Sequence, residues 1–206
     1  MSSERLLVVF VGQSGSGKTT LARLLAETMS AVVFEQDTTL IEQRNRRSPA
    51  FLDKFDLEAA DAYVSALLAG QPVTYMGYSQ ITRRRDTPIA LLPRPIIIVE
   101  GVLAGHLRVV CEYPNTRQFW IETSQAEADA RQLARVETEG WLAGMSRQEV
   151  LHRIASKHTQ EAAIVEAQRA KCDFILDNSG TPVSADLVAR VLALTASPHS
   201  VTTRAA

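Results

Sequence analysis

The chain has 206 residues, of which 46% are hydrophobic and 22% are charged, a balance typical of a folded globular protein and unlike a disordered or collagen-like chain. Its length suits one domain whose core needs no disulfide or metal. A formal net charge of −1 argues against a polybasic surface for nucleic acid or an anionic membrane. We therefore expect a single domain over residues 1–196, no nucleic-acid or membrane partner, and a disordered polar tail over residues 197–206.

The cysteines and the amino-terminal segment argue against further classes of protein. Cys111 and Cys172 form no CxxC pair, and the four histidines show no metal-ligand spacing with them. The first apolar run is too short for a membrane span, and no signal-peptide cleavage pattern follows it. We expect a cytoplasmic protein without a zinc site or disulfide framework.

The first elements alternate between strand and helix. The valine-rich run Leu6–Val11, followed by Gly12, predicts a buried central strand. Residues 18–29 have helical spacing, and Asp56–Ala69 forms a second helical pattern that ends before Gly70. Four more apolar runs predict further strands, at Val32–Phe34, Ile96–Val99, Phe119–Ile121 and Phe174–Leu176.

Capping signals predict the remaining helices. Ser124 and Ser146 are each followed three residues later by glutamate, the capping-box pattern, so we expect a helix after each serine. The second of these is expected to run to about Ala170, and Pro182 is expected to open a last helix that reaches about Ala196. Strands that alternate with helices predict a parallel sheet covered on both faces.

Two long stretches do not fit this alternation. Residues 38–55 have no regular pattern, and residues 77–94 contain Pro88, Pro93 and three consecutive arginines. We expect both stretches to be irregular loops. Long loops inside a compact domain are usually functional, so both are candidates for ligand contact.

Residues 12–19, GQSGSGKT, match GxxxxGK[ST] at every fixed position, between a predicted strand and a predicted helix. Such glycines let backbone N–H groups converge on phosphate oxygens, and the helix N-terminus adds partial positive charge. The alternative is a glycine-rich turn without ligand. Lys18 is expected to bridge the β- and γ-phosphates, and Thr19 to hold Mg²⁺. The predicted nucleotide contacts are Gly12, Ser14, Gly15, Ser16, Gly17, Lys18, Thr19 and Thr20.

Two acidic residues at predicted strand ends complete the expected site. Glu100 follows Ile96–Val99 and is expected beside Mg²⁺, directly or through a water; otherwise it is a solvated strand-end acid. Asp37 follows Val32–Phe34, where strand order puts it across the sheet from the γ-phosphate. A carboxylate there can orient an attacking hydroxyl and accept its proton, although a turn or capping aspartate is the alternative. The chain has no NKxD sequence, which disfavours a GTPase.

These residues resemble the uridine kinase branch of the P-loop kinases, which is related to phosphoribulokinases and pantothenate kinases. The resemblance covers about residues 6–195 and keeps the order and spacing of the motifs. The motifs are GQSGSGKTT at 12–20, Asp37, KFDLEAADAY at 54–63, LLAGQPV at 67–73, Tyr78, and IIIVEGVLAGH at 96–106.

The resemblance implies a fold and several residue roles. The implied fold is a three-layer α/β/α sandwich with a mostly parallel sheet and a helical lid, and the implied phosphoryl donor is ATP with Mg²⁺. Asp37 matches the family's base, Asp56 matches a residue that binds sugar hydroxyls, and Tyr78 matches a tyrosine beside the acceptor. From the sequence alone, Asp56 can instead be a helix N-cap and Tyr78 a surface aromatic. Related uridine kinases form homo-oligomers, which implies the same here.

Two departures on the acceptor side weaken a uridine or cytidine assignment. Leu40 stands where the family usually has a tyrosine, and Arg83 stands near the usual position of a pyrimidine-holding histidine. Arginines such as Arg83 and Arg85 can instead bind an acidic or phosphorylated acceptor bidentately, unless they only form a solvated loop. His106 is a further candidate for the acceptor side, or a structural histidine.

The lid also departs from the family. Its basic segment corresponds to residues 138–141 here, where only the glycine is kept. Arg131 and Arg135 share one helix face and are the candidates to contact phosphates during transfer. The alternative is an exposed pairing with Glu127 or Glu139.

The sequence therefore predicts a kinase that transfers the γ-phosphoryl group of ATP to a hydroxyl of a small molecule. A nucleoside or nucleoside-like compound is the first candidate for this acceptor. Two alternatives stay open. One is a kinase for another metabolite, such as a sugar phosphate, a pantothenate-like alcohol or an antibiotic. The other is a nucleotide-dependent regulatory ATPase that acts on a protein partner.

Overall fold

A computed structural model describes residues 4–140, 142, 144–180 and 183–196. The expected tail over residues 197–206 and the expected helix start at Pro182 lie outside these residues. None of the helices described is both long and apolar enough to cross a membrane.

The centre of the fold is a five-stranded sheet in the order β2-β5-β1-β6-β7, with every neighbouring pair parallel. The central strand β1 pairs with β5 at Val9 and Val99, and with β6 at Phe10 and Phe119. The strands are β1 (Leu6–Val11), β2 (Val32–Glu35), β5 (Ile96–Glu100), β6 (Thr116–Glu122) and β7 (Phe174–Asp177). The sheet confirms the α/β class and the five predicted strands.

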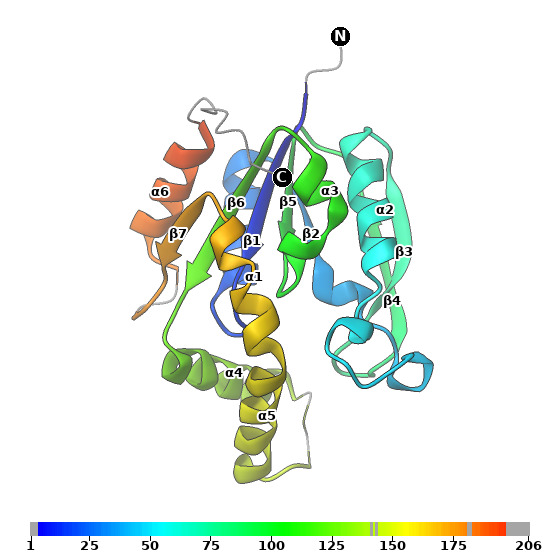
Figure 1. Cartoon of the computed structure of the whole chain (residues 1–206), viewed down its shortest axis with the longest axis vertical. Coiled ribbons are helices and arrows are strands. Elements are labelled where there is room, and N and C mark those ends of the chain that lie inside the picture. Colours follow the sequence, from blue (N-terminus) through cyan, green and yellow to red (C-terminus); the bar gives the residue numbers. More distant parts are fainter. Residues whose placement is uncertain (1–3, 141, 143, 181–182, 197–206) are drawn as a thin grey trace.

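Helices cover both faces of this sheet (Figure 1). On one face α1 (Lys18–Met29) and α6 (Ala185–Ala196) bury Leu21, Leu25 and Val191. The other face is covered by α2 (Leu57–Leu68), the short α3 (Arg108–Glu112) and the carboxyl-terminal part of α5 (Arg147–Glu166). The central strands β1 and β5 are apolar on both faces because helices pack against each face of the sheet.

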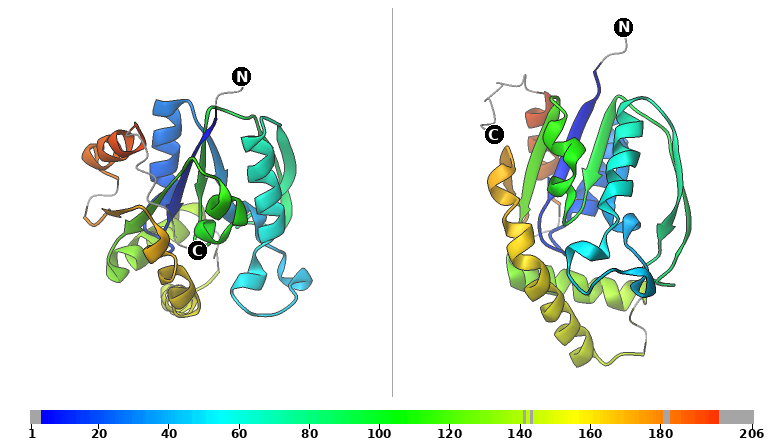
Figure 2. Two further views of the ribbon diagram at one scale, coloured as in Figure 1. Left: turned by 45° about the horizontal axis from the view of Figure 1, so that its top comes forward. Right: turned by 45° about the vertical axis from the view of Figure 1, so that its right-hand side comes forward.

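The lid helices are α5 together with α4 (Gln125–Glu139), and they extend beyond the carboxyl ends of the strands (Figures 1 and 2). Both predicted caps are present, because Ser124 and Ser146 each accept a hydrogen bond from a first-turn N–H. Only Ser146 forms the full reciprocal box with its glutamate. The helix α5 ends at Glu166, short of the expected Ala170, and a 3-10 turn follows it.

The expectation of an irregular loop over residues 77–94 is wrong. Instead β3 (Val73–Tyr78) and β4 (Arg85–Leu91) form an antiparallel hairpin that lies beside α2 (Figure 2). Along β3 alternate residues are buried, a period-two pattern that indicates a strand. β4 has no buried residue and so lacks this signal, while Pro88 is tolerated because the two-stranded hairpin leaves it on an edge.

The other irregular stretch is confirmed. Residues 38–55 contain no long helix or strand, only short 3-10 turns at Gln36–Thr39, Gln43–Asn45 and Leu52–Lys54. An isolated bridge pairs Leu40 with Phe55 and closes this stretch on itself. Leu40 also packs against the core, which gives its apolar side chain a structural role.

Stability of the sheet is tested at Phe119, which is fully buried between the rings of Phe10 at 5.5 Å and Phe174 at 5.0 Å. Phe119→Ala should lower the free energy of unfolding by about 3–5 kcal/mol in urea titrations, because it leaves a cavity. Ile81→Ala, at a side chain that is 70% exposed, is the control and should change the value by less than about 0.5 kcal/mol. Equal losses in both variants would contradict this packing.

Candidate active site

The phosphate loop, residues 12–19, connects β1 to the first turn of α1. Gly15 and Gly17 have φ of 86° and 93°, in the left-handed region where glycine is favoured. Gly17 is also the N-cap of α1, and no side chain caps that helix. The N–H groups of the first turn are therefore free to bind an anion, where the helix dipole adds positive charge. Thr20 is exposed in the same turn.

Neighbouring elements hold the loop closely. The Asn178 side chain, after β7, donates from Nδ2 to the Ser16 carbonyl over 2.7 Å. Its Oδ1 accepts the Val183 N–H. A Cβ at Gly15 would collide with the backbone of Ala128 in α4. The loop conformation is thus fixed by β7 on one side and by the lid on the other.

The side chain of Lys18 packs against the phosphate loop of which Lys18 is itself a part. Its side chain is 6% exposed, and Nζ donates to the carbonyls of Gly12 at 2.9 Å and Gln13 at 2.8 Å. Burial lowers the pKa of Lys18, while the charges of Glu100 and Asp37 oppose that shift. The ammonium therefore lies among carboxylates at the place where the sequence predicts phosphates.

Thr19 and Glu100 meet as the sequence predicts. Thr19 Oγ1 donates to Glu100 Oε1 over 3.0 Å, and Glu100 is 4% exposed. Burial, helped by the nearby charges of Asp37 and Glu35 and opposed by the charge of Lys18, raises the pKa of Glu100 to about 7. A divalent cation would relieve this accumulation of negative charge.

The donor chemistry fits Mg²⁺. A hydroxyl and one or two carboxylates, completed by substrate phosphates, are the oxygen ligands that Mg²⁺ uses in nucleotide sites. Thr19 and Glu100 supply these types within hydrogen-bond distance of each other. Within the described part of the chain, no cluster of three or more His, Cys, Asp or Glu side chains has the geometry of a metal site. The ion would therefore depend on the nucleotide for its remaining ligands.

Asp37 lies in the 3-10 turn directly after β2. The register of β2 on β5 pairs Glu35 with Glu100, so the turn begins beside the end of β5. The turn is fixed to β3 because Thr38 Oγ1 and Tyr75 OH are 2.7 Å apart. Asp37 Oδ1 is buried and has no hydrogen-bond partner among the described residues. A buried carboxylate oxygen without a partner is an open acceptor for a donor from a ligand.

Three predicted acceptor-side residues come together beside this turn. Asp56 caps α2 through the Ala59 N–H and also pairs with Arg85, at 3.4 Å between Oδ2 and Nη1. Tyr78 is the cross-strand partner of Arg85 in the hairpin. Asp56 is therefore a helix cap and also part of a polar cluster with Arg85 and its strand partner Tyr78.

Other predicted residues lie apart from this cluster. Arg83 is exposed in the hairpin turn with a φ of 56°. His106 is near the Ile164 carbonyl of α5, at 3.4 Å from Nε2. Arg135 forms an exposed pair with Glu139, the alternative that its spacing allowed.

Arg131 contacts the segment after β7. Its Nη2 donates to the carbonyls of Asn178 at 2.7 Å and Gly180 at 3.2 Å. Because Asn178 in turn holds the phosphate loop, Arg131 braces that loop through the segment after β7.

Sequence reasoning missed several polar residues around the site. Glu161 in α5 is 1% exposed and contacts Ser14 of the phosphate loop. Lys157, one turn earlier, acts electrostatically on both Lys18 and Lys54. The spacing of Lys157 and Glu161 indicated a shared helix face, but no local motif pointed that face at the phosphate loop.

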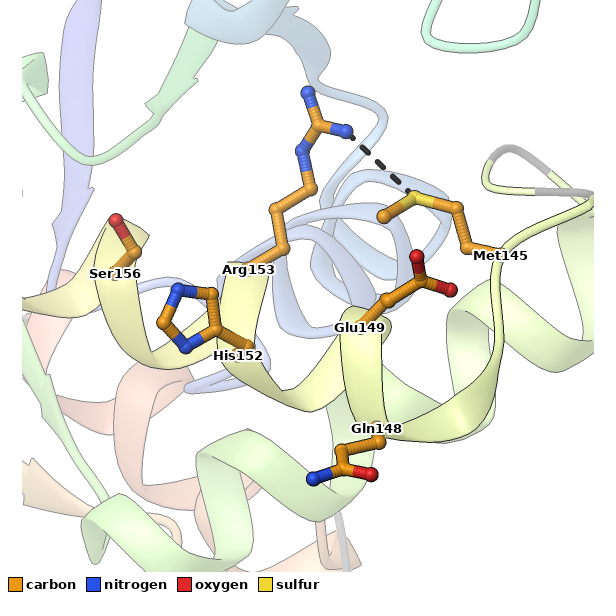
Figure 3. Close-up of a pocket in the computed structure, with 6 residues that line it drawn as sticks. All are labelled: Met145, Gln148, Glu149, His152, Arg153 and Ser156. Carbon is orange, nitrogen blue, oxygen red and sulfur yellow. Dashed lines mark hydrogen bonds between the residues drawn. The ribbon is translucent and has the colours of Figure 1, made fainter.

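A hollow on the lid is separate from this chemistry (Figure 3). It lies along the first half of α5, where Arg153 donates to the sulfur of Met145 over 3.6 Å. No phosphate-loop residue lines it. Its lining residues are Met145, Gln148, Glu149, His152, Arg153 and Ser156.

Comparison with solved structures gives the class of fold. A putative fructose transport system kinase from a Silicibacter species matches with a TM-score of 0.61 and 24% identity, over 85% of this chain and 91% of that one. A possible uridine kinase from Bacillus stearothermophilus matches with a TM-score of 0.52 and 19% identity, over 86% and 91%. The chain has the α/β fold of the P-loop kinases.

Comparison with curated protein sequences shows which P-loop kinases the chain resembles. A uridine kinase from Borrelia duttonii is 32% identical over 100 residues, which span 45% of this chain and 48% of that protein. The chain thus spans about half the length of the curated relatives it matches. No protein-family model matches it. Together the comparisons confirm its resemblance to the uridine kinase-like P-loop kinases.

The raised pKa of Glu100 makes stability depend on pH. Between its ordinary value of 4.5 and about 7 the folded state binds more protons than the unfolded state, so stability falls as pH rises. At pH 8 and without Mg²⁺, the free energy of unfolding of Glu100→Gln should therefore be higher than that of the wild type by about 1–3 kcal/mol. The difference should disappear near pH 4.5.

Urea titrations at both pH values measure this effect. Glu27→Gln, at an exposed position of α1, is the matched control and should show no such pH dependence. A Glu100→Gln variant that is less stable than the wild type at pH 8 would show that the carboxylate is not destabilised by its surroundings.

Proposed function

We propose that this protein is a small-molecule kinase that transfers the γ-phosphoryl group of ATP, with Mg²⁺, to a hydroxyl of a nucleoside or nucleoside-like acceptor. The observation that carries the proposal is the buried Oδ1 of Asp37, which has no partner among the residues described and lies at the same sheet edge as Lys18 and the Thr19–Glu100 pair. This edge combines a phosphate site, a cation site and a hydroxyl-binding carboxylate, the three parts that phosphoryl transfer to an alcohol needs.

The mechanism follows from these parts. Asp37 accepts the hydrogen bond of the acceptor hydroxyl and takes its proton as the oxygen attacks the γ-phosphorus and the bond to the ADP oxygen breaks. Lys18 moves its ammonium from the loop carbonyls to the phosphates. The N–H groups of the α1 N-terminus neutralise further charge. Bound Mg²⁺, held by Thr19 and Glu100, would supply the remaining charge neutralisation.

The nucleoside-like acceptor is supported by sequence. The curated relatives are uridine kinases, and Asp56 and Tyr78 match the acceptor-side positions of that family. Asp56 keeps a carboxylate oxygen at the cluster in addition to its capping role, so it can still accept from a sugar hydroxyl.

An anionic acceptor is the second candidate, and the basic side chains of Lys54 and Arg85 favour it. Burial lowers the pKa of Lys54, and the nearby cations Arg46 and Lys157 lower it further. Arg85 adds a guanidinium that is 27% exposed. A phosphate or carboxylate on the acceptor would offset this repulsion. The Silicibacter neighbour, described as a putative fructose transport system kinase, is compatible with a sugar-like acceptor.

Phosphoryl transfer is tested by mass spectrometry with ATP, Mg²⁺ and a panel of nucleosides, sugars, sugar phosphates and pantothenate-like alcohols. One compound should gain a phosphoryl group, and Asp37→Asn should lower turnover with it by about 10²- to 10⁴-fold, since the base is lost. ATP binding should persist. Asp186→Asn, exposed at the start of α6, is the control with unchanged turnover.

The outcomes separate the alternatives. Near-normal turnover in Asp37→Asn would remove the base assignment. Slow ATP hydrolysis that no compound accelerates would favour a regulatory ATPase over a kinase.

A substitution of Arg85 tests whether the acceptor carries a negative charge. If the acceptor is anionic, Arg85→Gln should raise its KM about tenfold, the effect of one lost charge-assisted hydrogen bond. If the acceptor is a neutral nucleoside, its KM should stay within about twofold. Arg94→Gln, on an exposed segment after β4, is the control. Equal KM changes in both variants would refute a specific role for Arg85.

A further inference from the structure

Both lid helices hold Ser14 of the phosphate loop. From α5, Glu161 Oε1 accepts the Ser14 N–H over 3.1 Å, and Glu161 Oε2 accepts the Ser14 hydroxyl over 3.1 Å. From α4, Gln132 Nε2 donates to the Ser14 carbonyl over 3.3 Å. The backbone donor and acceptor of one loop residue are therefore both bound by lid side chains.

Glu161 has no part in the chemistry proposed above, yet it is only 1% exposed. Burying a carboxylate is costly unless hydrogen bonds or nearby charges offset the loss of water. Here both carboxylate oxygens bind Ser14, and the charge of Glu161 acts on Lys18 of the same loop. Among the described residues, the contacts to Ser14 are the closest that offset this cost, and His158 Nε2 lies farther away, at 3.9 Å from Glu161 Oε1.

A second set of contacts orients Gln132. Its Nε2 lies 2.6 Å from His158 Nε2, and His158 Nδ1 lies 2.8 Å from Asp129 Oδ1. Asp129 favours a proton on Nδ1, in which case Nε2 accepts from Gln132, while Gln125 Nε2 also contacts Nδ1. The two N–H groups of the Gln132 amide then go to His158 and Ser14. A flip of the amide would place its oxygen against the Ser14 carbonyl and lose that bond.

We propose that Glu161 and Gln132 are positioning residues that hold the Ser14 peptide in the conformation that binds the nucleotide phosphates. The proposal rests on nucleotide binding by the phosphate loop. Gly15 follows Ser14 and lies against Ala128 of α4, so the lid surface fixes two successive loop residues. If these contacts are lost, the loop must be ordered by the nucleotide itself, and the ordering cost weakens binding.

Calorimetric titration with Mg²⁺ and ATP tests this proposal without any acceptor. Glu161→Ala should weaken ATP binding about tenfold, because the Ser14 N–H loses a charged acceptor. Glu161→Gln should stay within about threefold of the wild type, since an amide oxygen still accepts that N–H and the phosphates lose a nearby negative charge. Glu166→Ala, exposed on the same helix, is the matched control and should bind like the wild type.

A structural role alone would not give this pattern. In Glu161→Ala we expect KM for ATP to rise while KM for the acceptor does not change. Ser14→Ala and Glu161→Ala should combine less than additively in binding free energy, because they remove a shared contact. If Glu161→Ala does not fold by circular dichroism, Gln132→Ala, which removes the contact to the Ser14 carbonyl, should weaken ATP binding by itself about threefold or more.

The results that would contradict the positioning role can be told apart from a failure of the proposed function. Unchanged ATP affinity in both Glu161→Ala and Gln132→Ala, with a wild type that binds ATP, would overturn the positioning role alone. Equal weakening by Glu161→Ala and Glu166→Ala would also overturn it. A wild type that does not bind ATP would overturn the proposed function and this inference with it.

Discussion

The burial of opposite charges at the carboxyl edge of the sheet is the constraint on which the site depends. Lys18 and Glu100 are 6% and 4% exposed, so each has lost most of its water, and burial disfavours the charged form of both. Each charge partly stabilises the other, while Asp37 adds negative charge to the same place. Because the carboxylates outnumber the ammonium, the edge favours a ligand that brings a cation, as the proposed nucleotide with Mg²⁺ would.

The parallel sheet brings these groups together. β1 carries the phosphate loop, β5 ends in Glu100, and β2 leads into the turn of Asp37, and these three strands are neighbours in the order β2-β5-β1. Carboxyl ends of parallel strands share one edge, so residues far apart in the chain converge without long connections. The lid helices then close against the same loop.

Sequence patterns predicted those parts whose signals are local. The phosphate loop, the buried strands and the caps of the lid helices each depend on a few adjacent residues. The β3–β4 hairpin was missed because β4 has no buried residue and therefore no apolar alternation. The contact of Glu161 with Ser14 spans 147 residues, and no nearby pattern specifies it. Arg135 has the helical spacing expected of an arginine that contacts phosphate, but it pairs with Glu139. Spacing alone does not select the partner of a side chain.

A crystal structure with a non-hydrolysable ATP analogue and Mg²⁺ would show directly whether the phosphate loop binds the nucleotide. We expect the β- and γ-phosphates inside the phosphate loop, Lys18 turned away from the carbonyls of Gly12 and Gln13 to meet them, and the ion beside Thr19 and Glu100. Asp37 should face the γ-phosphate across a space for an acceptor hydroxyl. A nucleotide bound elsewhere, or Lys18 still on the loop carbonyls beside an occupied site, would contradict the central claim.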